Sequence, residues 1–538
     1  RISASDASIR MPPEGEPLKP AEIDAIRRWI DAGAQAPADE EPESDPRDHW
    51  AFRAPVRPAV SQVKDATWNR HPIDAFIAAS REHRELIPQP DADRRIWLRR
   101  VYFDLVGLPP TMEEQNAFLH DNSPNACDNV VATLLDRPQY GERWGRHWMD
   151  IWRYSDWWGL GAEVRNSQKH IWHWRDWIIE SLNNDKAYDQ MLREMLAADE
   201  LYPNDPDRLR ATGFLARQYF KFNRTSWMDE TIQHTSKAML GLTFNCAKCH
   251  DHKYDPISQR DYYRMRAFFE PYQIRTDMVG SEVDFEKDGI PRSFDCNPDA
   301  ATYVHIRGDD RNPDKEHIIH PGVPAFLNFT ELKISPVGLP LEAWNPGLRQ
   351  EVVEAWLQTA SRRIAESQKL LQTAQNKFEE STLAAASNGG APPNSDKSLQ
   401  TANGGDNVLS VERALLQRNL AEATLRKAEA ELESIKARSA ADRATAESSS
   451  SPRMRELIVA AARSERVVAA LAAEETMFRR ELDLLQSPAE KRAAAEKKLA
   501  EAQQSLQEAR TTIDRPSDSY TPLIGSLKTL ENNLETEE

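Results

Sequence analysis

Apolar residues recur at helical spacing through much of the chain. Tyr140, Trp144, Trp148 and Trp152 are each four residues apart. Residues three or four positions apart share one face of an α-helix, so this spacing predicts a helix with an aromatic face. Two further helices are predicted in the same way, one by Trp174, Ile178 and Leu182 and a short amphipathic one by Ile23, Ile26, Trp29 and Ile30 after Pro20.

The second half of the chain has a different pattern. From about Arg349 the composition shifts to Ala, Glu, Gln, Lys, Arg and Leu, and the apolar positions form a heptad-like seam, as in Val353, Leu357, Ala360, Ile364, Leu371, Ala374 and Phe378. Breaks are expected at 388–407 and 448–452, and Ser487-Pro488 is expected to begin the last helix. The pattern predicts three or four long helices folded back as antiparallel hairpins. An intermolecular coiled coil would bury the same seam, so self-association stays open.

The predicted fold class is therefore mainly α. Residues 273–345 differ, because they are rich in proline, contain short β-prone pieces and have no helical period. Residues 35–48 are acidic and proline-rich and predict a linker. The predicted organisation is residues 1–34, the linker 35–48, a helical domain 49–272, a loop-rich or small β segment 273–345, helical hairpins or a coiled coil at 349–515, and a tail at 516–538.

Charge and hydropathy exclude some functions. The 538 residues carry a net charge of −17, which argues against a nucleic-acid partner or an anionic membrane surface. No run approaches the roughly 18 apolar residues of a membrane span, so no transmembrane segment is predicted. The first residue is Arg1 rather than Met, and we expect a cut or processed end downstream of any targeting signal.

Two of the four cysteines lie in the string CAKCH at 246–250. This is C-x-x-C-H, the attachment motif of c-type haem, in which Cys246 and Cys249 would form thioethers to two vinyl groups and His250 would bind the iron. At the residue frequencies of this chain, chance gives about 0.0007 such strings. The sequence therefore predicts covalently bound haem c at these three residues.

Two other interpretations share the cysteine pair. A thioredoxin-like redox pair expects a strand-to-helix turn within a βαβ unit, whereas the surroundings here are predicted to be helical. A zinc site could use Cys246, Cys249, His250 and His252, but structural zinc normally takes two separated ligand pairs, and no second cysteine pair exists.

The second axial ligand of the iron stays open. His252 is too near His250 in sequence to reach the opposite face of the haem. His147 and His234, both on predicted helices, are candidate ligands, although a histidine on a helix is commonly a satisfied hydrogen-bonding group. Met239 and Met265 are further candidates, and a vacant sixth position would permit peroxide or small-ligand chemistry.

Three smaller features also have alternatives. The eight tryptophans between 144 and 177 are typical of core packing, but they could also wall a haem crevice or stack on sugars. Cys127 and Cys296 could form a disulfide in an oxidising compartment. The Arg-Gly-Asp string at 307–309, followed by Asn312-Pro313, predicts an ordinary turn rather than an adhesion site.

The stretch 240–269, LGLTFNCAKCHDHKYDPISQRDYYRMRAFF, resembles the central signature of the planctomycete cytochrome C family, which comprises large secreted proteins. Residues 105–111, 140–154 and 172–182 resemble the helical part upstream of that signature, and 304–327, with HIRGDDRNP and HPGVPAF, resemble the segment after it. Residues 10–34 are similar to the end of a small cytochrome c domain that often precedes this unit. Residues 1–34 would then be its C-terminal remnant, and the methionine of the M-P-P string, Met11 here, would be a haem ligand in the intact protein. The resemblance implies a chain that is open at both ends, with a C-terminal domain beyond residue 538.

The motif and the resemblance together imply an exported c-type cytochrome, periplasmic or on the cell surface. Its role would be electron transfer with a redox partner protein or a neighbouring cytochrome domain. The alternatives are a haem-dependent oxidase or peroxidase, which needs an open iron site, and a coiled-coil scaffold whose cysteines bind zinc or no metal.

Overall fold

The computed structural model describes residues 2–4, 10–11, 16–37, 45–64, 71–157, 168–218, 220, 223–280, 282–327, 333–387, 404–447, 452–517 and 519–523. They form two compact units, one made of residues 1–59 with 253–256 and 326–329, the other of the remaining chain. Several predicted features lie outside the described residues: half of the linker (38–44), the helix breaks at 388–403 and 448–451, Trp158, and the tail from 524 onward.

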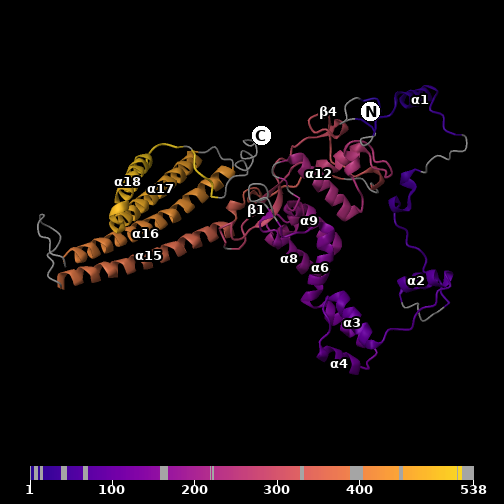
Figure 1. Cartoon of the computed structure of the whole chain (residues 1–538), viewed down its shortest axis with the longest axis horizontal. Helices are drawn as coiled ribbons and strands as arrows, with labels where there is room; N and C mark the ends of the chain where they lie inside the picture. Colours follow the sequence, from indigo (N-terminus) through magenta and orange to yellow (C-terminus); the bar gives the residue numbers. More distant parts are fainter. Residues whose placement is uncertain are drawn as a thin grey trace. The chain divides into compact units, whose positions relative to one another are not determined.

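The first unit contains the predicted amphipathic helix, α1 (Pro20–Asp31) (Figure 1). Pro20 suits its first turn because its φ is already helical, and the Glu22 carboxylate accepts a hydrogen bond from the Lys19 backbone N–H (2.7 Å). No residue of α1 is buried. Two short 3₁₀ helices, Pro46–Asp48 and Trp50–Phe52, follow.

The second unit is mainly α, as predicted. Its N-terminal part comprises α2 (Pro72–His83), α3 (Arg94–Leu105), α4 (Met112–His120), α5 (Ala126–Leu135), α6 (Pro138–Trp152), α8 (Trp172–Asn183), α9 (Tyr188–Leu201), α10 (Pro206–Leu209), α11 (Gly213–Ala216), α12 (Arg224–Thr235) and α13 (Gln259–Phe269). A π-helix at Ser236–Leu240 extends α12, and 3₁₀ helices lie at Arg210–Thr212 and Asn245–Lys248. None of the described helices is long and apolar enough to cross a membrane.

Two small antiparallel sheets follow α13. Strand β1 (Tyr272–Asp277) pairs with β2 (Ile290–Asp295), and β3 (Thr302–His305) pairs with β4 (Pro313–Ile319). The β-prone piece TYVHI therefore forms a strand as predicted. The chain then continues through α14 (Leu341–Trp344) into the long helices.

Helices α6 and α8 pack against each other at close range. The contact is made through Gly141 and Gly145 of α6, where an added Cβ would lie 2.4 Å from the backbone oxygen of Ile179 and 3.2 Å from its side chain. Trp152, Trp174 and Trp177 are fully buried around this crossing. These three tryptophans are therefore part of the packed core, whereas Trp144 and Trp157 are exposed.

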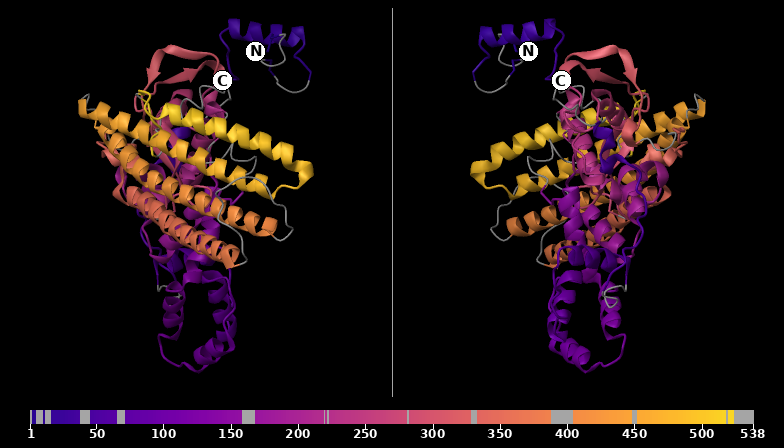
Figure 2. Two further views of the ribbon diagram at one scale, coloured as in Figure 1. Left: turned by 90° about the vertical axis from the view of Figure 1, so that its left-hand side faces the viewer. Right: turned by 90° about the vertical axis from the view of Figure 1, so that its right-hand side faces the viewer.

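The last four helices are α15 (Gln350–Ser387), α16 (Gly404–Ala446), α17 (Pro452–Gln486) and α18 (Arg492–Thr512). They lie side by side in one layer, and each packs along its neighbour in sequence (Figure 2). This is the predicted set of antiparallel hairpins. The seams are lined mostly by alanine, including the fully buried Ala423, Ala441 and Ala461, which let the helix backbones approach closely.

Candidate functional site

The C-x-x-C-H motif lies on the short 3₁₀ helix Asn245–Lys248 and the turn that follows it. In a 3₁₀ helix residues i and i+3 are on the same side. Phe244 and Ala247 therefore share the inner side, where both are fully buried, while Cys246 and Cys249 share the outer side and are exposed. The apolar pair anchors the turn and the two thiols, both free, face outward.

Lys248, between the two cysteines, ties the turn to the helices beneath it. Its ammonium lies 2.5 Å from the Asp229 carboxylate of α12, which also accepts a hydrogen bond from the Tyr262 hydroxyl of α13. Its backbone oxygen accepts hydrogen bonds from the Gln259 amide (2.9 Å) and the Tyr263 hydroxyl (3.1 Å), both on α13. Burial raises the pKa of both tyrosines, so their hydroxyls remain donors. The motif is thus held by its central residue, and its reactive side chains do not take part in these bonds.

His250 is exposed, and its Nδ1 lies 2.7 Å from the backbone oxygen of Asp251. A carbonyl can only accept, so Nδ1 carries the proton and Nε2 carries the lone pair. A ligating histidine commonly has this arrangement, with one ring nitrogen fixed by a backbone carbonyl and the other turned to the metal. The Asp251 carboxylate in turn accepts a hydrogen bond from the backbone N–H of Gln259 (2.7 Å) at the start of α13. Two free thiols and an oriented imidazole are the donors that a covalently attached haem requires, so the residues fit this group.

A second segment, 53 to 63 residues downstream of Cys249, belongs to the site. Gly308, in the turn after β3, lies against Cys249: a Cβ added to this glycine would be 2.3 Å from the Cys249 Sγ. The Gln259 amide that holds Lys248 is also 3.4 Å from the backbone oxygen of His305. One side chain of α13 therefore links the motif to the HIRGD segment.

Sequence reasoning did not single out His305 as a site residue. Its ring is buried, lies edge-on to Tyr263 (centroids 5.3 Å apart), and its Nδ1 has no hydrogen-bond partner among the described residues. Burial lowers the pKa of His305, with further contributions from the positive charges of Arg266 and Lys248. The sequence signal was the unusual HIRGD string, which predicted only a turn.

The predicted additional iron ligands have different surroundings. His234 is on α12, which packs on the motif turn, but both of its ring nitrogens are used: Nε2 is 2.6 Å from the Glu230 carboxylate and Nδ1 is 2.8 Å from the Arg153 guanidinium. His147 is exposed on α6, edge-on to Trp144. Met11 is exposed in the first unit. In this arrangement His234 has no ring nitrogen left for a metal.

The other two cysteines lie outside the motif and are not joined by a disulfide. Cys127 is exposed on α5, and Cys296 is half-buried just after β2, with its Sγ 3.7 Å from the Pro271 backbone oxygen. The possible disulfide between them is not formed in the structure.

Among the described residues, ligand atoms of three metal-binding side chains come within 4.8 Å of one another at Asp314, Glu316 and His317 on β4. These side chains are half-buried or exposed, and Asp314 and His317 already form an ion pair (3.0 Å). The zinc interpretation needs Cys246, Cys249, His250 and His252 instead. Among the described residues, the ligand atoms of these four side chains do not form such a group.

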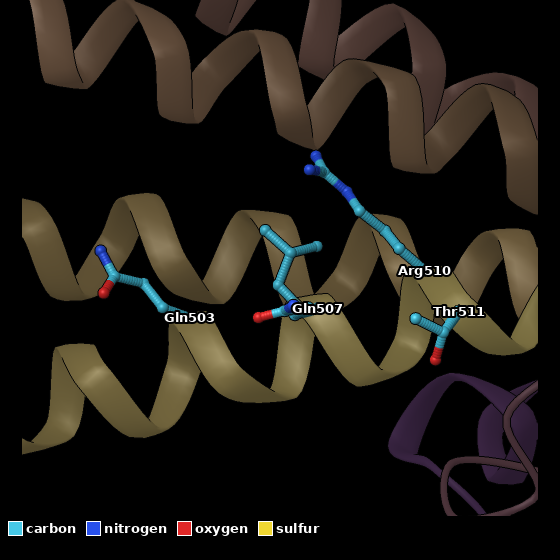
Figure 3. A pocket seen from close by; sticks show the side chains of 5 residues that line it. Gln503, Gln507, Arg510 and Thr511 are labelled. Atoms are coloured by element: carbon cyan, nitrogen blue, oxygen red, sulfur yellow. The ribbon is translucent and has the colours of Figure 1, made fainter.

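A depression of about 440 Å³ lies on the surface of α18 (Figure 3). It is lined by Gln503, Leu506, Gln507, Arg510 and Thr511. The Arg510 guanidinium points to the neighbouring helix and lies 3.2 Å from the Glu474 carboxylate. The Thr511 hydroxyl donates to a backbone carbonyl. This lining pairs no nucleophile with a base, so it offers no alternative to the motif as a site of chemistry.

Part of the chain matches a protein-family model. Residues 72–274 match the model of a family described as a protein of unknown function (DUF1549), with the short name PSCyt2. The matched part runs from α2 into β1 and contains the whole C-x-x-C-H motif together with α12 and α13. No curated protein and no solved structure matches the chain.

Proposed function

We propose that this chain is part of an exported, c-type cytochrome-like protein that binds haem covalently and transfers electrons. The observation that carries the proposal is the chemistry of the motif turn. Cys246 and Cys249 are free and exposed on one side of a 3₁₀ helix, and His250 has Nδ1 tied to a carbonyl with Nε2 left as the donor. Covalent attachment needs two thiols and an imidazole in this order.

Each part of the site has a role in the proposal. Bound haem supplies a one-electron carrier. Cys246 and Cys249 would hold it by thioethers, so the carrier would be retained even when the protein unfolds. His250 would bind the iron through Nε2, and the hydrogen bond from its Nδ1 to the Asp251 carbonyl makes Nε2 more basic. The Asp229 carboxylate neutralises the positive charge of Lys248 beneath the turn.

Location and partner follow from the attachment chemistry. Thioether formation needs reduced thiols and haem delivered on the outer side of a membrane, so the proposed location is the periplasm or cell surface. The proposed partner is a redox protein or a neighbouring cytochrome domain. His234 already uses both of its ring nitrogens and is therefore left out of the proposal, which names His250 as one axial ligand.

The test is expression of the full chain together with machinery for haem c maturation, followed by an absorption spectrum and denaturing electrophoresis stained for haem. We expect a Soret band and a haem stain that stays with the polypeptide, and both are expected to be lost in a Cys246→Ala, Cys249→Ala variant. The matched control removes the other two cysteines, Cys127→Ala and Cys296→Ala, and should keep the stain.

Other outcomes separate the alternatives. A colourless protein that carries stoichiometric zinc, or no metal, would refute haem binding and favour a scaffold. A haem protein whose spectrum shifts on addition of cyanide or carbon monoxide would have an open iron site and favour an oxidase or peroxidase over a carrier.

A further inference from the structure

The turn after β3 places a backbone, rather than a side chain, against one of the two motif thiols. A Cβ added to Gly308 would lie 2.3 Å from Cys249 Sγ but 3.4 Å from Cys249 Cβ. A separation of 2.3 Å is far inside the contact distance of carbon and sulfur, whereas 3.4 Å is an ordinary contact. The sulfur therefore occupies the space that any side chain at position 308 would need.

The turn is fixed, so it cannot simply move away from the thiol. Ile306 N–H donates to Asn312 O (2.9 Å), Asn312 N–H donates to Asp309 O (3.0 Å), and the Arg311 guanidinium holds the Asp309 carboxylate (3.0 Å). Gln259 ties the preceding His305 to the motif backbone. A larger residue at 308 would therefore displace the Cys249 thiol rather than the turn.

We propose that Gly308 is a positioning residue for the second haem attachment. Because it has no side chain, it leaves free the space that the Cys249 sulfur occupies. This inference rests on the proposed function. In the attachment step the Cys249 S–H adds across a vinyl C=C: the S–C bond forms at the inner vinyl carbon and the hydrogen ends on the terminal carbon, with no net oxidation or reduction. Gly308 affects this step only through the position of the Cys249 thiol. The atoms nearest to a Cβ added at Gly308 belong to Cys249 and not to Cys246, so the attachment at Cys246 does not depend on that residue.

The test compares Gly308→Ala with Gly241→Ala in the full chain. Gly241 is a matched control, because its φ of +67° is close to the +77° of Gly308, while an added Cβ there meets nothing within 4 Å. Both substitutions carry the same backbone strain, but only one reaches a thiol. After haem maturation, haem peptides are analysed by mass spectrometry and the protein by its pyridine haemochrome spectrum.

For Gly308→Ala we expect loss of the Cys249 thioether with the Cys246 thioether kept, and a haemochrome band at longer wavelength because one vinyl group remains conjugated. Gly241→Ala should keep both thioethers. Two thioethers in Gly308→Ala, or the same loss in both variants, would overturn the inference.

Two measurements do not need haem. In the haem-free protein, the rate of alkylation of Cys249 relative to Cys246 should change in Gly308→Ala and stay unchanged in Gly241→Ala. Gly308→Ala should also destabilise the protein less in a Cys249→Ala background, because the sulfur that the new Cβ would meet is absent. Equal destabilisation in both backgrounds would overturn the inference. If these hold and no haem binds, the proposed function fails but the positioning of Cys249 by Gly308 stands.

Discussion

Asp295, at the end of β2, is a half-buried carboxyl group close to two other carboxyl groups, Asp199 and Glu200 of α9. Burial raises the pKa of Asp295 to about 7, and the negative charges of Asp199 and Glu200 act in the same direction. In the unfolded chain the group has its ordinary pKa of 3.8. Between these values the folded state keeps a proton that the unfolded state has lost.

The free energy of unfolding should therefore fall as pH rises from about 4 to about 7. The two pKa values are about 3 units apart, so at about 1.4 kcal/mol per unit the loss is at most about 4 kcal/mol. Asp295→Asn cannot ionise, so it should remove the contribution of Asp295 to this loss and stabilise the protein at pH 7.5. Burial also raises the pKa values of Asp199 and Glu200, and their contributions to the pH dependence remain. Urea unfolding at pH 5 and pH 7.5 measures the change in the free energy of unfolding between the two pH values. Asp299→Asn, at an exposed position nearby, should leave the pH dependence unchanged, and an unchanged profile in Asp295→Asn would contradict the prediction.

The candidate site was only partly predictable at this scale. Cys246, Cys249 and His250 form a contiguous string, so their chemistry depends on spacing alone. Gln259, Tyr263 and Gly308 are separate in sequence, and their roles depend on contacts that only folding makes. The bonds of His234 to Glu230 and Arg153 show the same limit, because a helical histidine looks alike in sequence whether it is free or paired.

Between elements, the crossing of α6 and α8 depends on Gly141. Its N–H donates to the Asn183 side chain (2.8 Å), and an added Cβ would be 2.4 Å from the Ile179 backbone oxygen. Alanine favours a helix over glycine by about 1 kcal/mol. Overpacking costs about 1–3 kcal/mol, and the added Cβ would also lie 2.7 Å from the Asn183 side chain, so the cost here should be at the upper end of that range and outweigh the propensity.

We expect Gly141→Ala to lower the free energy of unfolding by about 1–2 kcal/mol, measured by urea denaturation. Gly338→Ala is the control, because a Cβ there meets nothing within 4 Å. A Gly141→Ala protein as stable as the parent would show that the two helices can separate without cost.

The long helices illustrate what periodicity can predict. The heptad-like seam predicted their existence and approximate ends, since amphipathic spacing is a property of consecutive residues. It left open whether the partner was the same chain or another. The structure pairs each helix with its sequence neighbour through small residues such as Ala423 and Ala461, so the seams are filled within one chain.

At the scale of the second unit, Asp277 joins distant parts of the chain. Its carboxylate binds Arg275 (2.8 Å), Arg292 (2.7 Å) and Arg349 (3.4 Å), all of them buried. Arg275 also donates to the backbone of Ala343 (2.8 Å), and Arg349 precedes α15. Burial alone would raise the pKa of Asp277, but the three guanidinium groups outweigh burial and hold it well below its ordinary value.

Asp277→Asn should therefore cost about 3–5 kcal/mol, because three buried cations lose their shared counter-charge. Hydrogen exchange should speed up in both 272–295 and 341–352, since the same carboxylate holds both segments. Asp284→Asn is the control. It removes a partly exposed ion pair with Lys287 but keeps an oxygen that can accept the Glu286 backbone N–H, so it should change neither stability nor exchange. Faster exchange confined to 272–295 would show that Asp277 does not hold the start of α15.

The sequence by itself determined the mainly helical class, a set of three or four long helices and the C-x-x-C-H motif, because each of these depends on residues that are near one another in the chain. Tertiary structure decided what depends on distant residues. It buries Asp277 among three arginines, occupies both nitrogens of His234, and seats Gly308 against Cys249, 59 residues away in sequence. Spacing along a chain records local geometry, whereas burial and pairing arise only when the packed elements exclude water and bring these groups together.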